Sequence, residues 1–158
     1  DLVRSRGLGD VYKRQILAGL ILGSKRGGYV GLLFLFLGLA LPVLAGGGTT
    51  LRALAGPTAG YIIGYVLSPA VAGAIAYRSP KNKGGMAVVL AVAAIVGLAV
   101  QYICGAFGLM IRSGLEIGPA FAAQLPFIPV DAGKLVVAVI IALGVHSAFP
   151  DLMGRKAA

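Results

Sequence analysis

The chain contains few of the residues on which soluble domains, disulfides and metal sites depend. Only 12% of its 158 residues are charged, whereas an average soluble domain has about 25%. It has a single cysteine, Cys104, and a single histidine, His146. One cysteine excludes an intramolecular disulfide, and no CxxC or HExxH motif occurs, so we expect no metal site built by this chain alone. Cys104 lies inside an apolar run and is interpreted as a small packing residue.

Apolar residues are abundant and occur in long runs. They make up 58% of the sequence, glycine occurs 25 times, and the mean hydropathy is +0.93. Such values are typical of a polytopic membrane protein. The runs are unbroken, unlike the short alternating segments of an outer-membrane barrel, which favours helices. We therefore predict an all-α fold, a polytopic transmembrane helical bundle.

Four runs are long enough to cross a bilayer, for which about 20 residues are usual and about 17 suffice. They cover residues 29–45, 58–77, 86–111 and 132–149. A fifth apolar piece covers residues 16–23 and would reach only about 12 Å as a helix. We interpret this piece as the end of a helix whose beginning is missing.

The first fifteen residues, DLVRSRGLGDVYKRQ, differ from everything that follows. They carry four basic residues, show no apolar periodicity and change abruptly to membrane sequence at Ile16. This stretch resembles a translated sequencing adapter. We therefore predict that residues 1–15 are a non-native tail and that residues 16–158 form a single transmembrane domain lacking its first helix. A genuine basic N-terminal arm is the alternative.

The basic residues of the connections predict the orientation in the membrane. Counted loop by loop, seven of them fall on one side and two on the other; the first side holds Lys25, Arg26, Arg78, Lys81, Lys83, Arg155 and Lys156, and the second holds Arg52 and Arg112. Because cytoplasmic connections are rich in Lys and Arg, we expect the first side and the C-terminus to be cytoplasmic. The net charge of +9 is thus interpreted as a topology signal, and nucleic-acid binding is not expected.

The stretch from Gly46 to Gly64 combines glycines with hydrogen-bonding side chains. Gly60 and Gly64 lie one helical turn apart, which predicts close approach of a neighbouring helix. Packing alone accounts less well for the polar cluster on the outer side, which comprises Gly46, Gly47, Gly48, Thr49, Thr50, Arg52, Thr58 and Tyr61. The loop lacks the Lys-Ser/Thr ending of a phosphate-binding loop, so nucleotide binding by this chain is not expected.

Asp131 and Lys134 stand at the start of the last apolar run, on one face of the expected helix near its outer end. A charged residue in hydrocarbon costs roughly 2.5–3.5 kcal/mol on insertion scales, so we expect Asp131 and Lys134 to serve a structural or functional purpose. One interpretation is an exposed ion pair at the interface, which contributes little. The other is a pair facing the bundle interior, where Asp131 accepts hydrogen bonds from a ligand N–H and Lys134 engages an anion.

Three further polar residues lie in the apolar runs. Gln101 and Tyr102 are expected at mid-depth or slightly outward, where they complete the same pocket, although an interhelical hydrogen bond is the simpler role for Gln101. His146 is expected near the cytoplasmic interface, away from that pocket. The sequence shows no carboxylate pair, nucleophile and base, or metal cluster, so no enzyme is predicted.

Three stretches resemble a known family. LAGLILGSKRGGYVGLLFLFLGLALPVLAGGG, LAGPTAGYIIGY and LPFIPVDAGK are similar to the BioY family, the substrate-binding (S) components of energy-coupling-factor (ECF) biotin transporters. The resemblance runs from Ile16 to the C-terminus, and GPTAGY together with the Asp-x-x-Lys opening of the last helix is a fairly specific combination. It implies a six-helix fold, of which this chain would hold the last four helices and the tail of the second.

The resemblance implies biotin as a transported ligand rather than a cofactor, bound without covalent chemistry. Asp131 would accept hydrogen bonds from the ureido end, and Lys134 would donate to the ureido oxygen or pair with the carboxylate, for which Arg52 is a second candidate. The family's lid and helix-start region matches the glycine turn, Thr58 and Tyr61. The predicted substrate-binding residues are Asp131, Lys134, Tyr61, Thr58, Gly47, Gly48, Arg52, Gln101 and Tyr102.

The resemblance also implies partners and a location. Such proteins lie in the bacterial plasma membrane and dock on a transmembrane coupling subunit with two ATPase subunits, largely through small residues of the first helix. Two alternatives remain open. One is an S component for another small vitamin. The other is a membrane-embedded enzyme or a structural subunit. An enzyme would need an acid, a base or a nucleophile near mid-membrane, and only Asp131, Lys134 and Tyr102 could act as one.

Overall fold

The computed structural model describes residues 2–44 and 47–154, with side chains from Lys13 onward. Within this part the chain is helical, and the sole strand-like feature is an isolated bridge between Leu44 and Gly48. The predicted all-α fold is therefore confirmed. The elements in chain order are α1 (Leu2–Ala40), α2 (Thr50–Ala55), α3 (Ala59–Ala76), α4 (Lys83–Ser113), α5 (Ile117–Ala122), the 3-10 helix η2 (Leu125–Phe127), α6 (Ile128–Ala148) and the 3-10 helix η3 (Pro150–Met153).

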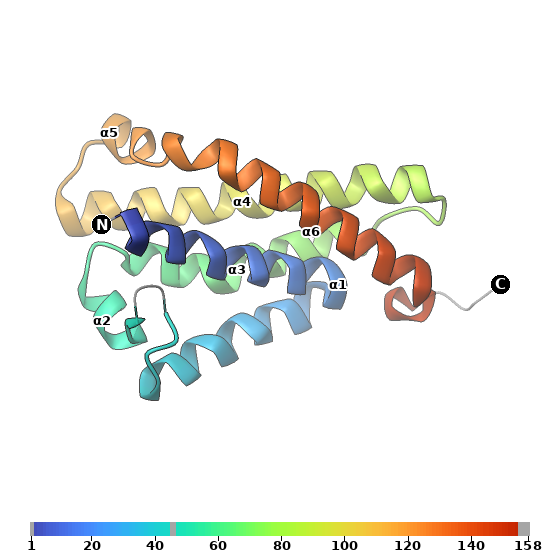
Figure 1. Cartoon of the computed structure of the whole chain (residues 1–158), viewed down its shortest axis with the longest axis horizontal. Coiled ribbons are helices and arrows are strands. Elements are labelled where there is room, and N and C mark those ends of the chain that lie inside the picture. Colours follow the sequence, from blue (N-terminus) through green and yellow to red (C-terminus); the bar gives the residue numbers. More distant parts are fainter. Residues whose placement is uncertain (1, 45–46, 155–158) are drawn as a thin grey trace.

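Helix α1 consists of two helical segments joined at Gly23. Gly23 has φ 86° and ψ −179°, a conformation that residues with a Cβ rarely adopt, and the chain reverses its direction there (Figure 1). The sequence predicted a span beginning at residue 29 and placed Lys25 and Arg26 in the connection before it. Both predictions were wrong in detail, because one glycine suffices to turn the chain and Lys25 and Arg26 already lie in the second segment.

Among the residues that the structure describes, four segments are long and apolar enough to cross a membrane. They are Lys13–Ala40, Ala59–Ala76, Lys83–Ser113 and Ile117–Ala148. Each overlaps one of the four runs predicted from the sequence, although the first is interrupted at Gly23 and the fourth includes α5 and η2 as well as α6. The chain is thus built as a multi-pass membrane protein.

Helix α3 lies between α1 and α4 and packs closely on both, through glycines. On the α4 side, a Cβ at Gly60 would collide with the carbonyl oxygen of Cys104 and a Cβ at Gly64 with the Gln101 side chain. On the α1 side, a Cβ at Gly31 would collide with the carbonyl oxygen of Tyr65. The close helix approach predicted for Gly60 and Gly64 is confirmed, and it brings backbones into contact because these positions lack side chains.

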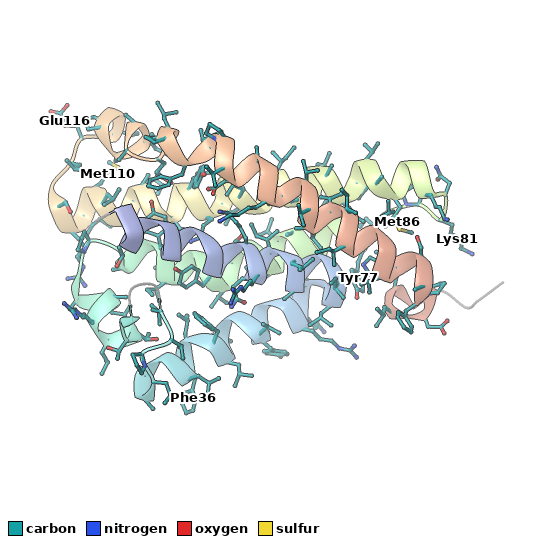
Figure 2. All side chains as sticks on the ribbon, viewed as in Figure 1. Phe36, Tyr77, Lys81, Met86, Met110 and Glu116 are labelled. Atoms are coloured by element: carbon teal, nitrogen blue, oxygen red, sulfur yellow. The ribbon has the colours of Figure 1, made fainter. Side chains whose placement is uncertain are left out.

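The bundle has two ends of different construction (Figure 1). One end holds α2 and α5; the other holds the Gly23 break, the α3–α4 turn and the end of α6. Figure 2 places Lys81 at the latter end and Glu116 at the former. At the α2 end, Arg112 Nη2 donates to the carbonyl oxygen of Leu54 at 2.9 Å, so the two predicted outer arginines, Arg52 and Arg112, belong to neighbouring helices. Arg155 and Lys156 lie outside the described residues.

Two side chains cap the break in α1. A helix that stops at Gly23 leaves its last carbonyl oxygens without intrahelical donors. Tyr77 Oη donates to the carbonyl oxygen of Ile21 at 2.7 Å, and His146 Nε2 lies 2.7 Å from that of Leu20, so this nitrogen must carry the ring proton. Burial raises the pKa of the Tyr77 phenol, which keeps it a donor. His146 lies in the last turn of α6, away from Asp131 as expected from the sequence, and it is buried, with only 2% of the residue exposed. Its position at the membrane interface remains a prediction.

Candidate functional site

Asp131 lies in the first turn of α6 and faces the bundle interior. Its side chain is 2% exposed. Tyr102 Oη, from α4, donates a hydrogen bond to Asp131 Oδ2, and Lys13 Nζ, from α1, lies 2.5 Å from Oδ1. A buried carboxylate needs such partners because burial removes its hydration. Of the two interpretations left open by the sequence, the structure therefore favours the inward-facing carboxylate.

Lys134 stands one turn after Asp131 on the same helix and is half-buried. It is close enough to Lys13 for the two ammonium groups to repel each other. The cluster of Lys13, Asp131 and Lys134 therefore has two positive groups and one negative group, a surplus that favours an anion. The N-terminal end of α6 favours negative charge in the same place.

Lys13 was missed as a site residue because it lies in the stretch interpreted as a non-native tail. The ion pair with Asp131 joins opposite ends of the chain, and no spacing rule in the sequence indicates it. The tail origin of residues 1–15 remains a prediction. In the structure the Lys13 ammonium pairs with one of the two carboxylate oxygens of Asp131, the candidate acceptor of ligand hydrogen bonds.

Gln101 and Tyr61 form the α3–α4 side of the site. Gln101 is fully buried, and its Nε2 donates to the carbonyl oxygen of Tyr61 at 3.2 Å, which confirms the interhelical role considered from the sequence. Its Oε1 is buried and has no hydrogen-bond partner among the described residues. The Tyr61 ring packs on Gly105, where a Cβ would collide with it, and the Tyr61 phenol lies within electrostatic reach of Asp131.

The other predicted residues lie in the α2 region. Thr58 precedes α3, and its Oγ1 donates to the carbonyl oxygen of Ala53 at 3.5 Å. Gly48 pairs with Leu44 in a backbone bridge, and Gly47 between them has φ 72°. Gly46 lies outside the described residues. These contacts give Thr58, Gly47 and Gly48 structural roles, and their contact with a ligand remains a prediction.

Arg52 lies on α2, a short helix that the sequence analysis did not predict. Its backbone N–H donates to Thr49 Oγ1 at 3.3 Å, the usual cap at the start of a helix, and the residue is exposed. No described contact joins its guanidinium to Asp131 or Lys134. Its proposed role toward a ligand carboxylate therefore remains a prediction.

Gln124 is a second residue that the sequence analysis missed. It lies in the connection between α5 and η2, is 4% exposed, and its Nε2 donates to the carbonyl oxygen of Tyr102 at 3.0 Å. A signal was present: Gln124 is the only polar side chain between Glu116 and Asp131 in the sequence. A single amide in an apolar stretch needs a partner, and here the partner belongs to the helix that carries the Asp131 contact.

A groove opens beside the cluster, between the first segment of α1 and α6. Its volume is about 220 Å³, and it is lined by Lys13, Arg14, Leu17, Lys134, Val137, Ala138 and Ile141. A larger groove of about 530 Å³ between α4 and α6 is lined by aliphatic residues. The basic residues line the first groove beside aliphatic ones, which suits a ligand with an anionic group and an apolar part.

The arrangement is suited to binding rather than to chemistry. A buried carboxylate accepts hydrogen bonds from N–H groups, and lysine and tyrosine side chains donate to a carbonyl or carboxylate. Over the described residues no group of three or more His, Cys, Asp or Glu side chains could hold a metal ion. The site can therefore recognise a small molecule that presents N–H donors and an anionic or carbonyl oxygen.

Comparisons with known proteins place the chain. The model of the BioY family matches residues 14–151. A biotin transporter BioY of Rhizobium etli is 36% identical over 146 residues, covering 89% of this chain and 78% of the relative, and one of Thermotoga maritima is 35% identical over 133 residues, covering 80% and 73%. The crystal structure of the S component for biotin from an ECF-type ABC transporter superposes with a TM-score of 0.75 and 27% identity, covering 86% of this chain and 73% of that one. The chain therefore belongs to the BioY family.

Proposed function

We propose that this chain is the substrate-binding S component of an ECF-type biotin uptake transporter, which captures biotin from the outside and delivers it inward. One observation carries the proposal in a chain of this family: the buried Asp131 carboxylate, held by Tyr102 and accompanied by Lys134, at the start of α6. The relatives named as biotin transporters and the biotin S-component structure support it.

The chemistry of biotin matches these groups. Its ureido ring presents two N–H donors and a carbonyl oxygen, its thiophane ring is apolar, and its side chain ends in a carboxylate. Asp131 is the natural acceptor for the N–H groups, and the Lys134 ammonium is a donor for an oxygen. In this arrangement a ureido N–H takes the place of the Lys13 ammonium at Asp131 Oδ1.

The proposed mechanism is binding followed by a change of exposure, with no covalent step and no cofactor. The relatives are named as transporters, in agreement with the prediction that the chain is not an enzyme. Energy would come from a partner module, consisting of a transmembrane coupling subunit and two ATPase subunits. The C-terminus is proposed to be cytoplasmic, because the Gly23 break and the α3–α4 turn carry most of the basic residues of the connections.

Equilibrium binding of radiolabelled biotin to the detergent-purified chain tests the proposal. Asp131→Asn and Lys134→Ala are each expected to weaken binding roughly 10- to 100-fold, because a hydrogen bond to a charged group contributes about 1.5–3 kcal/mol. Lys81→Ala, at the opposite end of the bundle, is the matched control and should bind like the unsubstituted chain.

Two results would overturn the assignment to biotin. The first is a well-folded chain that does not bind biotin but binds another small vitamin, which would support the alternative S-component specificity. The second is equal affinity of the unsubstituted chain and both variants, which would remove Asp131 and Lys134 from the site.

A further inference from the structure

Gln124 anchors a segment whose residues are almost all exposed. From Leu115 to Ala123 the one buried residue is Ala120, and every other residue is exposed. Gln124 is buried, and its Nε2 donates both to the carbonyl oxygen of Tyr102 at 3.0 Å and to that of Ala120 at 3.4 Å. One amide group therefore joins the α5 connection to α4.

The chain between Gln124 and Asp131 is stiff. The N–H of Phe127 donates to the carbonyl oxygen of Gln124 at 3.1 Å, which closes η2, and α6 begins at the next residue. Pro126 and Pro129 restrict the backbone within this stretch. With so few free dihedral angles, the place where Gln124 is held decides where Asp131 lies.

Tyr102 forms hydrogen bonds with both ends of the stretch from Gln124 to Asp131. Its backbone carbonyl oxygen accepts the hydrogen bond from Gln124, and its phenol donates to the Asp131 carboxylate. A single residue of α4 thus holds the connection before α6 and the acceptor in the first turn of α6. A shift of the connection along α4 would break one of these contacts or both.

We propose that Gln124 is a positioning residue of the substrate site: by holding the α5 connection on the Tyr102 carbonyl it places Asp131 opposite the Tyr102 phenol. The role deepens the proposed biotin binding and rests on it. Gln124 acts through Tyr102 and Asp131 and needs no contact with the ligand of its own.

The test uses the full chain and two measurements. Gln124→Leu keeps most of the side-chain volume and removes the amide donor; Leu125→Ala, at a 60% exposed position of the same connection, is the control. The first measurement is biotin affinity. The second is the rate of cleavage by a glutamyl endopeptidase after Glu116, the only glutamate of the chain, which reports how firmly the connection is held without any ligand.

We expect the Gln124→Leu variant to be cleaved several-fold faster by the endopeptidase. We expect it to bind biotin roughly 10-fold more weakly, as for the loss of one hydrogen bond. Leu125→Ala should change neither. Since Gln124 acts through Tyr102, the variant that carries both Gln124→Leu and Tyr102→Phe should bind biotin about as weakly as whichever of the two single variants binds it less tightly. Gln124→Met, which is unbranched like glutamine but has no amide donor and adds no second glutamate, replaces Gln124→Leu if the latter does not fold.

Unchanged affinity and unchanged cleavage in the Gln124 variant would overturn the positioning role. The positioning role would also be overturned if the fold-loss of biotin affinity in the double variant equalled the product of the fold-losses in the two single variants, because the two substitutions would then act independently. If the unsubstituted chain does not bind biotin, the proposed function has failed. The cleavage rates then decide the role of Gln124 as an anchor by themselves, faster cleavage supporting it and an unchanged rate overturning it.

Discussion

At the scale of single residues, the site is defined by what a buried carboxylate requires. Asp131 has almost no contact with solvent, so its two oxygens are satisfied by Tyr102 and Lys13. A hydrogen bond from a neutral phenol and an ion pair stabilise the carboxylate differently, because the ion pair also neutralises its charge. Replacing Lys13 by a ligand N–H removes that neutralisation, and Lys134, on the same helix, is the cation that remains beside Asp131.

Lys13→Met should therefore have opposite effects on stability and on affinity. We expect the unliganded chain to lose up to about 3 kcal/mol of stability, as when one partner of a buried ion pair is removed and a second cation stays nearby. We expect biotin to bind several-fold more tightly, because the Lys13 ammonium no longer competes with a ligand N–H for Asp131 Oδ1. Thermal unfolding and radiolabelled biotin binding measure the two effects.

Arg14→Met is the control for the Lys13 variant. Arg14 is the exposed neighbour of Lys13 and lines the same groove, but no described contact joins it to Asp131. Its replacement should leave the stability of the unliganded chain and its affinity for biotin nearly unchanged. Weaker binding of biotin to Lys13→Met would contradict the prediction and would make Lys13 a partner of the ligand.

At the scale of elements, glycine decides how closely the helices approach. Where α3 meets α4, Gly60 lies against the backbone at Cys104 and Gly108, so the helices touch without intervening side chains. Such contacts maximise van der Waals packing, which is what holds helices together where lipid is as apolar as the side chains. Gly105 and Gly64 extend the same surface and leave room for the Tyr61 ring and the Gln101 amide.

Gly60→Ala should destabilise the bundle strongly. The added methyl group meets backbone atoms that have no way to rotate aside, and overpacking of this kind costs about 1–3 kcal/mol or more. Gly144→Ala on α6 is the matched control, since a Cβ there meets nothing within 4 Å. Thermal unfolding in detergent compares them. Equal midpoints for the two variants would show that the α3–α4 contact does not carry stability.

At the scale of the whole molecule, the two ends differ in charge and in construction. The end with the Gly23 break and the α3–α4 turn carries Lys25, Arg26, Arg78, Lys81 and Lys83, while the end with α2 and α5 carries Arg52, Arg112 and the candidate site (Figures 1 and 2). An excess of Lys and Arg favours the cytoplasmic side. In the proposed orientation the candidate site lies in the outer half, as an uptake protein requires.

Cysteine labelling tests this orientation. In a Cys104→Ala background, which has no other cysteine, Glu116→Cys is expected to react with a membrane-impermeant maleimide in intact cells. Lys81→Cys should react only after the membrane is permeabilised. Both positions are exposed and stand at opposite ends of the bundle, so the pair is matched for reactivity. The reverse labelling pattern would falsify the proposed orientation.

The sequence by itself determined the class of the protein, the approximate spans and the α3–α4 packing surface, and it singled out Asp131 and Lys134 as candidate site residues. These follow from local properties: hydrocarbon rejects charge, a helix rises 1.5 Å per residue, and glycine lacks a side chain. The family resemblance drawn from the same residues was confirmed by the match over residues 14–151.

Only the tertiary structure decided that Gly23 reverses the chain by itself, that His146 is buried as a cap, and that Asp131 faces inward. It also brought Lys13 and Gln124 to the site. These facts depend on contacts between residues far apart in the chain. Periodicity and spacing describe one helix at a time and carry no information about which atoms of another helix will satisfy a buried polar group.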